Sequence, residues 1–166
     1  MKQKEFLTVM AVLDEETQRK MTELQQKIIS SGLKGTQTMG IPFHLSLGSF
    51  PTDREKELTE RIIRIAPAVR KFSVLLKQWN TFGFRVLFAE PEITDELVAL
   101  HALFDGNYAD GFPWQPHCTL FCGEESEVRQ ALSLVEDAAF PIHTEITAIE
   151  MGKFFPPRFI CRENLI

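Results

Sequence analysis

The sequence predicts one α+β domain built from two similar halves, with helices packed outside the sheets. Three observations support this prediction. The chain is 44% hydrophobic and 25% charged, a composition typical of a folded globular domain. Its 166 residues fit a single domain, because folding buries roughly 70% of the surface of an extended chain of this size. The order strand, helix, short strand, helix, strand occurs twice.

The first half covers residues 4–79, and its elements follow from hydrophobic patterning and helix-capping residues. We expect Asp14 to cap the first helix, and Thr52 with Glu55 to form a capping box on the second. Pro67 is expected to end that second helix. In order, we expect a strand at 4–13, a helix from 14 to about 32, a short strand at 43–47, a helix at 52–66 and a strand at 69–79.

The second half covers residues 83–151 and repeats this order before a closing strand at 158–164. The segments that open the first helix of each half are similar in sequence, since Leu13-Asp14-Glu15-Glu16-Thr17 resembles Ala89-Glu90-Pro91-Glu92-Ile93-Thr94. We interpret the repeat as an internal duplication. In order, we expect a strand at 85–89, a helix from 90 to Gly106, a loop to Pro116, a short strand at 117–121, a helix at 125–137 and a strand at 140–151.

Charge and cysteine content limit the partners and the compartment. The net charge of −5 disfavours a genome-binding or processive role on long nucleic acid, because such binding depends on Lys and Arg neutralising phosphates. A small nucleotide or an RNA end remains a plausible substrate. Three cysteines exclude a fully paired disulfide framework and favour a reducing compartment. The apolar stretch 6–13 ends in acidic residues instead of a cleavage site, so we expect a cytoplasmic protein without a membrane partner.

The two short strands carry the same His-x-Ser/Thr-Leu motif. Side chains alternate along a strand, so His44 and Ser46 share one face, and His117 and Thr119 share one face of the other strand. The complete segments are Pro42-Phe43-His44-Leu45-Ser46-Leu47 and Pro116-His117-Cys118-Thr119-Leu120. Each strand therefore presents an imidazole beside a hydroxyl, with apolar side chains behind them.

This pairing suits phosphate chemistry. A hydroxyl donates to a phosphate oxygen, a neutral imidazole accepts a proton from a nucleophile, and an imidazolium gives one to a leaving oxygen. A single histidine in such a strand is more often structural, but two in matching places of a repeat favour a shared site. We predict that His44 and His117 are catalytic and that Ser46 and Thr119 bind the phosphate.

The paired motifs resemble those of the 2H phosphoesterase superfamily, also called the 2′-5′ RNA ligase-like or cyclic phosphodiesterase superfamily. The resemblance rests on His44-Leu45-Ser46 and His117-Cys118-Thr119, and it extends over nearly the whole chain. It implies a bilobal α+β fold with pseudo-twofold symmetry and a central cleft that holds both motifs. It also implies catalysis without a metal or other cofactor.

The resemblance predicts a phosphodiesterase that hydrolyses a 2′,3′-cyclic phosphate, a 2′,5′ linkage or an ADP-ribose cyclic phosphate, with RNA ligation as the reverse reaction. RNA-processing members often have basic residues after the motif, whereas Gly48-Ser49 and Phe121-Cys122 follow here, which favours a small nucleotide or an RNA end. We expect a monomer. The alternatives are a non-catalytic nucleotide-binding or regulatory module on the same fold, and a structural or partner-binding domain.

Other residues have competing interpretations. Tyr108 and Trp114, with Phe112, either stack a nucleobase or pack the loop before the second motif. His101 and His143 are interpreted as structural. Cys118 and Cys122 are expected to lie together on the strand face opposite His117, which argues against a zinc site there. Lys153 and Arg158 either supply positive charge to a phosphate or lie on the surface.

Overall fold

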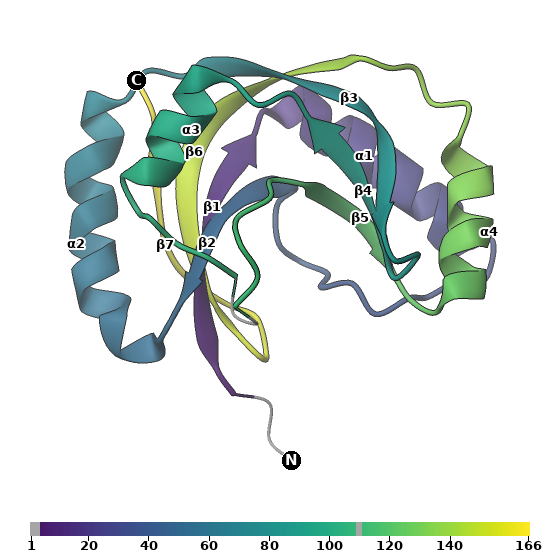
Figure 1. The fold of residues 1–166 in the computed structure, drawn as a ribbon, viewed down its shortest axis with the longest axis horizontal. Coiled ribbons are helices and arrows are strands. Elements are labelled where there is room, and N and C mark those ends of the chain that lie inside the picture. Colours follow the sequence, from purple (N-terminus) through teal and green to yellow (C-terminus); the bar gives the residue numbers. More distant parts are fainter. Residues whose placement is uncertain (1–3, 109–110) are drawn as a thin grey trace.

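A computed structural model describes residues 4–108 and 111–166. Within these ranges seven strands form one antiparallel sheet, and four α-helices flank it (Figure 1). The strands are β1 (Phe6–Leu13), β2 (His44–Phe50), β3 (Phe72–Phe82), β4 (Val86–Pro91), β5 (Cys118–Cys122), β6 (Ile142–Phe154) and β7 (Arg158–Asn164). The helices are α1 (Glu15–Ser30), α2 (Glu55–Ile65), α3 (Asp95–Ala102) and α4 (Glu125–Val135), with short 3₁₀ turns at Thr52–Arg54 and Ala66–Ala68. The α+β prediction is confirmed.

The order of the strands in the sheet is symmetric. The path β2-β1-β6-β3-β4-β5 becomes its own reverse when β1, β2 and β3 exchange places with β4, β5 and β6. The long strand β6 pairs with β3 through its first part and with β7 through its second part, so β7 extends the edge that β3 leaves open. This strand order is what two equivalent half-repeats around a twofold axis between β3 and β6 would produce.

The two lobes do not coincide with the two halves of the sequence. Helix α1 packs on α4 and β5, and helix α3 packs on β2, so each lobe takes one helix from the other half. Figure 1 accordingly shows α2 and α3 on one side of the molecule and α1 and α4 on the other. Because each lobe contains a helix from the other half of the sequence, the polypeptide chain passes from one lobe to the other and connects them.

The sheet curves until its outermost strands meet. Strands β2 and β5 lie next to each other, and the His44 backbone is close to the Cys118 thiol. Further along β2, Gly48 packs directly on Gly106 in the loop after α3, and the Ser49 amide donates to the Asn107 carbonyl of the same loop at 2.7 Å. The curvature therefore brings the two motif strands together, although they are the ends of the pairing path.

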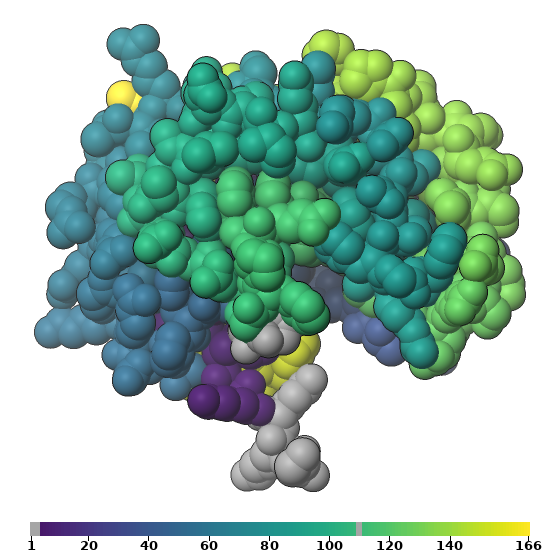
Figure 2. All heavy atoms as spheres, in the orientation of Figure 1, coloured from purple at the N-terminus to yellow at the C-terminus, as the bar shows by residue number. Residues whose placement is uncertain are grey.

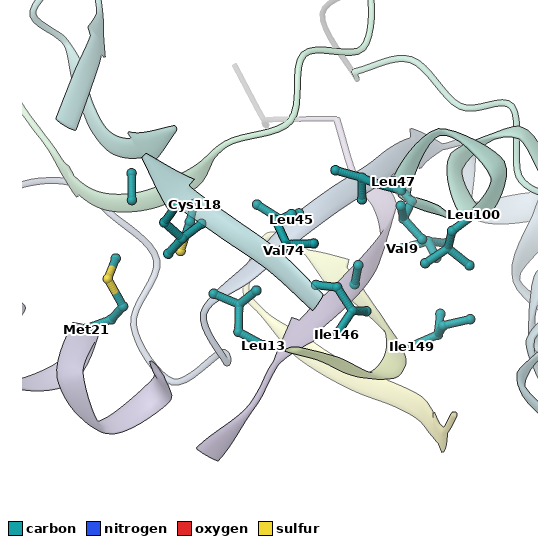
Figure 3. Packing of buried hydrophobic residues seen from close by; sticks show 14 of the residues in the cluster. Val9, Leu13, Met21, Leu45, Leu47, Val74, Leu100, Cys118, Ile146 and Ile149 are labelled. Carbon is teal, nitrogen blue, oxygen red and sulfur yellow. The ribbon is translucent and has the colours of Figure 1, made fainter. Parts of the chain in front are cut away.

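The apolar sides of both motifs anchor them in the core. Leu45 and Leu47 of β2, and Cys118 and Leu120 of β5, have no exposed surface. Figure 3 shows Leu45, Leu47 and Cys118 within one cluster of apolar side chains from β1, β3, β6 and the helices. Full burial of each leucine stabilises the fold by roughly 2 kcal/mol. The same packing fixes the direction in which the polar motif residues point.

Two helix starts test the predicted caps. Asp14 caps α1, since its carboxylate accepts from the Thr17 amide at 2.8 Å. The capping box predicted for α2 is wrong: Thr52 lies in a 3₁₀ turn, and Glu55 instead reaches Arg158 across the fold. A capping box does occur at the start of α4.

The predicted start of the third helix is also wrong. Glu90 and Pro91 pair with β3 as the end of β4, and the helix begins only at Asp95, with Thr94 as its cap. A proline is tolerated at the end of a strand, where its missing amide costs no ladder hydrogen bond. The helix also ends earlier than predicted, at Ala102, because Asp105 takes a left-handed conformation before Gly106. Among the described helices, none has the length and apolar character needed to cross a membrane.

The contact between Gly48 and Gly106 predicts the effect of a substitution. A Cβ atom at Gly48, whose φ is 149°, would lie 2.5 Å from the Gly106 Cα atom. We expect Gly48→Ala to lower the free energy of unfolding by about 3 kcal/mol, because both backbones must move apart. Urea unfolding followed by circular dichroism measures this loss. The control is Gly83→Ala: its φ is 53° with open space around it, and strain alone should cost about 1 kcal/mol. Equal losses of unfolding free energy in the two variants would contradict close packing between Gly48 and Gly106.

Candidate active site

Both motifs line one cavity of about 460 Å³, which lies between the lobes. All four predicted site residues, His44, Ser46, His117 and Thr119, are in its wall. Figure 2 shows the molecule hollowed between its two halves, with atoms of β1 in purple and of the turn between β6 and β7 in yellow along the lower edge. The expectation that the two strands face a common space is met, and the catalytic and phosphate-binding roles remain predictions.

The two imidazoles are held in the same way. Nδ1 of His44 is 2.7 Å from the Pro42 carbonyl oxygen, and Nδ1 of His117 is 2.8 Å from the Gln115 carbonyl oxygen. A carbonyl only accepts, so each Nδ1 carries a proton and donates it to the residue two positions earlier. In the neutral ring Nε2 is then the unprotonated nitrogen. Both rings therefore present the same tautomer, with Nε2 available as a base.

The hydroxyl of Ser46 completes the hydrogen bonding of the first imidazole. Its Oγ lies 3.1 Å from Nε2 of His44, to which it donates when the ring is neutral. Ser46 is held in turn by its backbone carbonyl, which accepts from the Trp114 indole at 2.9 Å. An anion that enters the cavity could replace the ring as the acceptor for this hydroxyl. The Ser46 hydroxyl therefore lies where it can donate a hydrogen bond to a bound phosphate.

Aromatic rings enclose the second imidazole. The His117 ring makes edge contacts with Phe82, Phe88 and Tyr108, at centroid distances of 4.9, 5.4 and 5.6 Å. The Tyr108 hydroxyl donates to the same Gln115 carbonyl and lies 3.4 Å from Nδ1 of His117. These contacts fix the orientation of the imidazole.

Burial keeps both histidines neutral at physiological pH. Burial, together with the charge that His117 carries when protonated, lowers the pKa of His44 to about 4, although the hydrogen bond to Pro42 acts in the opposite direction. Burial also lowers the pKa of His117. Desolvation disfavours the charged imidazolium because the surroundings replace water poorly. A bound anion would have the opposite effect and would raise the pKa of either ring.

A bulge in each motif strand overturns one prediction from the sequence. In the pairing of β5 with β4, Thr119 lies opposite Phe88 and Phe121 opposite Leu87, so Leu120 is an extra residue. The extra residue reverses the alternation beyond it, and Cys122 therefore faces the cavity, not the core as expected. Cys118 is buried as expected.

Strand β2 has the equivalent bulge. Opposite β1, Ser46 pairs with Met10 and Gly48 with Val9, so Leu47 is the extra residue. The residues that follow the two bulges at the same spacing are Ser49 and Cys122, and each is half-buried on the polar side of its strand. The correspondence between the motifs thus extends three residues beyond the hydroxyl.

The two aromatic residues considered for base stacking have different surroundings. The Trp114 indole stacks on His101 at 3.9 Å between centroids and lies outside the cavity wall. These surroundings favour the interpretation that Trp114 packs the loop before the second motif over stacking on a nucleobase. His101 also holds the Gly106 carbonyl at 2.8 Å, which agrees with its structural interpretation. Tyr108 contacts His117 and lies closer to the site.

Sequence reasoning missed much of the wall. Besides the motifs, the wall is formed by the loop between α1 and β2, by three phenylalanines at the ends of β1 and β6, and by Thr8 of β1 and Gln25 of α1. The loop's glycines, Gly35 and Gly40, were the signal that could have marked it, since both have positive φ. The phenylalanines are Phe6, Phe154 and Phe155, and their rings lie 5.6–5.9 Å apart between centroids.

The remaining candidates lie outside the wall. His143 is exposed on β6. Lys153 is paired with Glu5 and Arg158 with Glu55, each at 3.1 Å. In residues 4–108 and 111–166, no three His, Cys, Asp or Glu side chains are grouped as a metal site would require.

Sequence comparison identifies the family. A model of the 2′-5′ RNA ligase superfamily matches residues 40–154, which contain both motifs and most of the sheet. The chain therefore belongs to this superfamily of 2H phosphoesterases, and the resemblance stated from the motifs is confirmed. No curated protein sequence matches the chain closely enough to count as a relative.

Solved structures share the fold. TT0787 of Thermus thermophilus is 17% identical, with a TM-score of 0.64 over 96% of this chain and 97% of its own. LigT of Escherichia coli in its apo form is 18% identical, with a TM-score of 0.57 over 99% of both chains. A protein described as a phosphoesterase is also 18% identical, with a TM-score of 0.58 over 98% of this chain and 99% of its own. At these identities the likeness concerns the fold.

The lowered pKa of His44 predicts a loss of stability in acid. Its pKa is about 4 in the folded protein and about 6.5 when unfolded, so the unfolded chain binds the proton first as pH falls. Stability should be complete above about pH 6.5 and should fall by about 2 kcal/mol towards pH 4.5 through this group. Urea unfolding of wild type and His44→Asn at both pH values measures the contribution. A pH dependence that His44→Asn leaves unchanged would contradict it.

The bulge in β5 predicts which cysteine reacts. Cys122 faces the cavity, whereas Cys118 is fully buried and burial raises its thiol pKa to about 12. We expect iodoacetamide at about pH 8.5 to label Cys122 at least roughly tenfold faster than Cys118. Mass spectrometry of peptides after a time course gives both rates, and inorganic phosphate should slow the labelling of Cys122 alone. Labelling at equal rates would place Cys122 in the core.

Proposed function

We propose that the protein is a phosphodiesterase that hydrolyses a cyclic or 2′-linked nucleotide phosphate with two histidines and no metal. One observation carries the proposal: His44 and His117 line one cavity together with the hydroxyl residues of their motifs, and each has Nδ1 fixed on a carbonyl. Membership of the superfamily supports a phosphoesterase in general terms. The mechanism with two histidines is our proposal and goes beyond what membership of the superfamily supports.

The mechanism divides the proton transfers between the rings. One neutral imidazole takes a proton from water through Nε2 as the water attacks phosphorus, and the other, protonated, gives its proton to the leaving ribose oxygen. Ser46 and Thr119 donate to the non-bridging oxygens. When the hydroxyl of a second RNA end attacks phosphorus in place of water, the same two residues would serve as base and acid, so that one cyclic P–O bond breaks as the new 2′,5′ linkage forms.

Nucleotide complexes of a structural neighbour support a nucleotide substrate. LigT of Escherichia coli has been crystallised with 3′-AMP, with NADP+ and with ATP. The cavity of about 460 Å³ here falls in the usual range for small-ligand sites, roughly 300–1,000 Å³. We propose a small nucleotide or RNA end as substrate for a monomeric, cytoplasmic enzyme, with Tyr108 beside the site able to contact a base.

The main alternative is a nucleotide-binding module without activity. Such a module needs the hydroxyls but has no need for two imidazoles that both keep Nε2 unprotonated. The matched tautomers of His44 and His117 favour an enzyme. Both the enzyme and the non-catalytic module are expected to bind nucleotides, so only a measurement of turnover distinguishes them.

Substitution of either histidine tests the mechanism. We expect His44→Ala and His117→Ala each to lower kcat for a nucleoside 2′,3′-cyclic phosphate by roughly 10²- to 10⁴-fold, the usual contribution of general acid–base catalysis. Phosphorus NMR in the presence of EDTA follows the reaction and identifies the product. His143→Ala is the matched control, since His143 is exposed and outside the cavity. Activity that survives in either single variant would remove that histidine from the mechanism.

A further inference from the structure

The cavity wall consists of uncharged groups. Its polar side chains are hydroxyls and carboxamides, from Thr8, Gln25, Thr36, Gln37 and Thr38 as well as the motif residues. Its other side chains are apolar, aromatic or sulfur-containing. Among the residues that the structure describes, the two imidazoles are the only groups in the wall that can become positively charged.

The imidazoles can balance one negative charge. Burial lowers both pKa values, and the charge on one ring opposes protonation of the other, so the empty site is neutral. A phosphodiester carries a single negative charge, and one proton taken up between the rings compensates it. That is also the protonation state in which one ring is the acid and the other the base.

A second phosphate would find no such compensation. Moving an unpaired charge out of water into surroundings of low polarity is costly, and amides and hydroxyls offset only part of that cost. The two cations considered from the sequence, Lys153 and Arg158, lie outside the wall and are already paired with Glu5 and Glu55. The rest of the wall fits neutral groups, including the rings of Phe6 and Phe155.

We propose that this cavity selects nucleotides whose only phosphate is the one at the histidines, and that it discriminates against those with a further phosphate. The inference rests on the proposed function and narrows its substrate class. A nucleoside cyclic monophosphate, or an RNA end whose remaining phosphates stay outside, fits this site. ADP-ribose cyclic phosphate, whose diphosphate adds charge beside the reacting group, is disfavoured.

Equilibrium binding tests the selectivity without relying on turnover. Adenosine 3′-monophosphate and adenosine 3′,5′-bisphosphate differ only in the 5′-phosphate. Isothermal titration calorimetry with the full chain at about 50 mM salt and about pH 5, where a phosphomonoester carries close to one negative charge, should give at least roughly tenfold tighter binding of the monophosphate. Equal affinity, tighter binding of the bisphosphate, or binding of neither nucleotide would overturn the inference. Loss of catalysis with the selectivity intact would instead overturn the proposed function.

A positive charge added to the cavity wall should reduce the preference for the monophosphate over the bisphosphate. Met39 lies in the wall and is 46% exposed, so Met39→Lys places a cation there without opening the core. We expect the affinity ratio of the two nucleotides to narrow by about threefold, the usual effect of a partly exposed charge pair. Gln130→Lys on the exposed face of α4 adds the same charge away from the cavity and should leave the ratio unchanged. Equal narrowing in both variants would show a general charge effect and would overturn the role of the wall.

Discussion

The approach of β2 to β5 is the constraint on which the site depends. These strands are the two ends of the pairing path, and each carries one half of the proposed catalytic pair. The sheet must curve far enough for the His44 backbone to come close to the Cys118 thiol, and the loop after α3 must let Gly106 pack on Gly48. A flatter sheet could retain the same strand pairing, but it would move the imidazoles of His44 and His117 apart.

Strands at the end of a sheet leave backbone groups without a neighbouring strand. Side chains from elsewhere in the fold bind several of these groups. The Gln18 carboxamide bonds to both the amide and the carbonyl of Phe43, just before β2. On β5, the buried Gln25 donates to the Leu120 carbonyl at 2.9 Å, and the Gln37 carboxamide accepts from the Cys122 amide at 3.2 Å. These bonds hold the edge of each motif strand that is not paired with another strand, and they leave the polar faces open to the cavity.

Neutral histidines in an uncharged cavity make the site dependent on its ligand. Burial favours the unprotonated rings, whereas acid–base catalysis needs one proton between them. A phosphodiester anion would supply the charge that stabilises that proton. Proton uptake and anion binding would then be a single event, which ties the proposed chemistry to the proposed preference for a single phosphate.

The sequence by itself determined the elements and the motif chemistry. The apolar stripes and the Asp14 cap depend on neighbours within a few residues, and each His-x-Ser/Thr pair acquires a common face from strand alternation alone. The repetition of this pattern indicated a paired site. The predictions that failed, such as the cap at Thr52 and the start of the third helix, depended on distant partners on β7 and β3.

Only the tertiary structure decided how the two motifs meet and what surrounds them. The extra residue at Leu120 is defined by pairing with β4, so no local pattern could have shown that Cys122 faces the cavity. The stacking of Trp114 on His101 and the aromatic contacts of His117 likewise join segments whose separation in the chain gives no periodic signal. Burial, and with it the neutral state of His44, follows from the closure of the whole sheet. These features arise from long-range packing, whereas sequence patterns report short-range geometry.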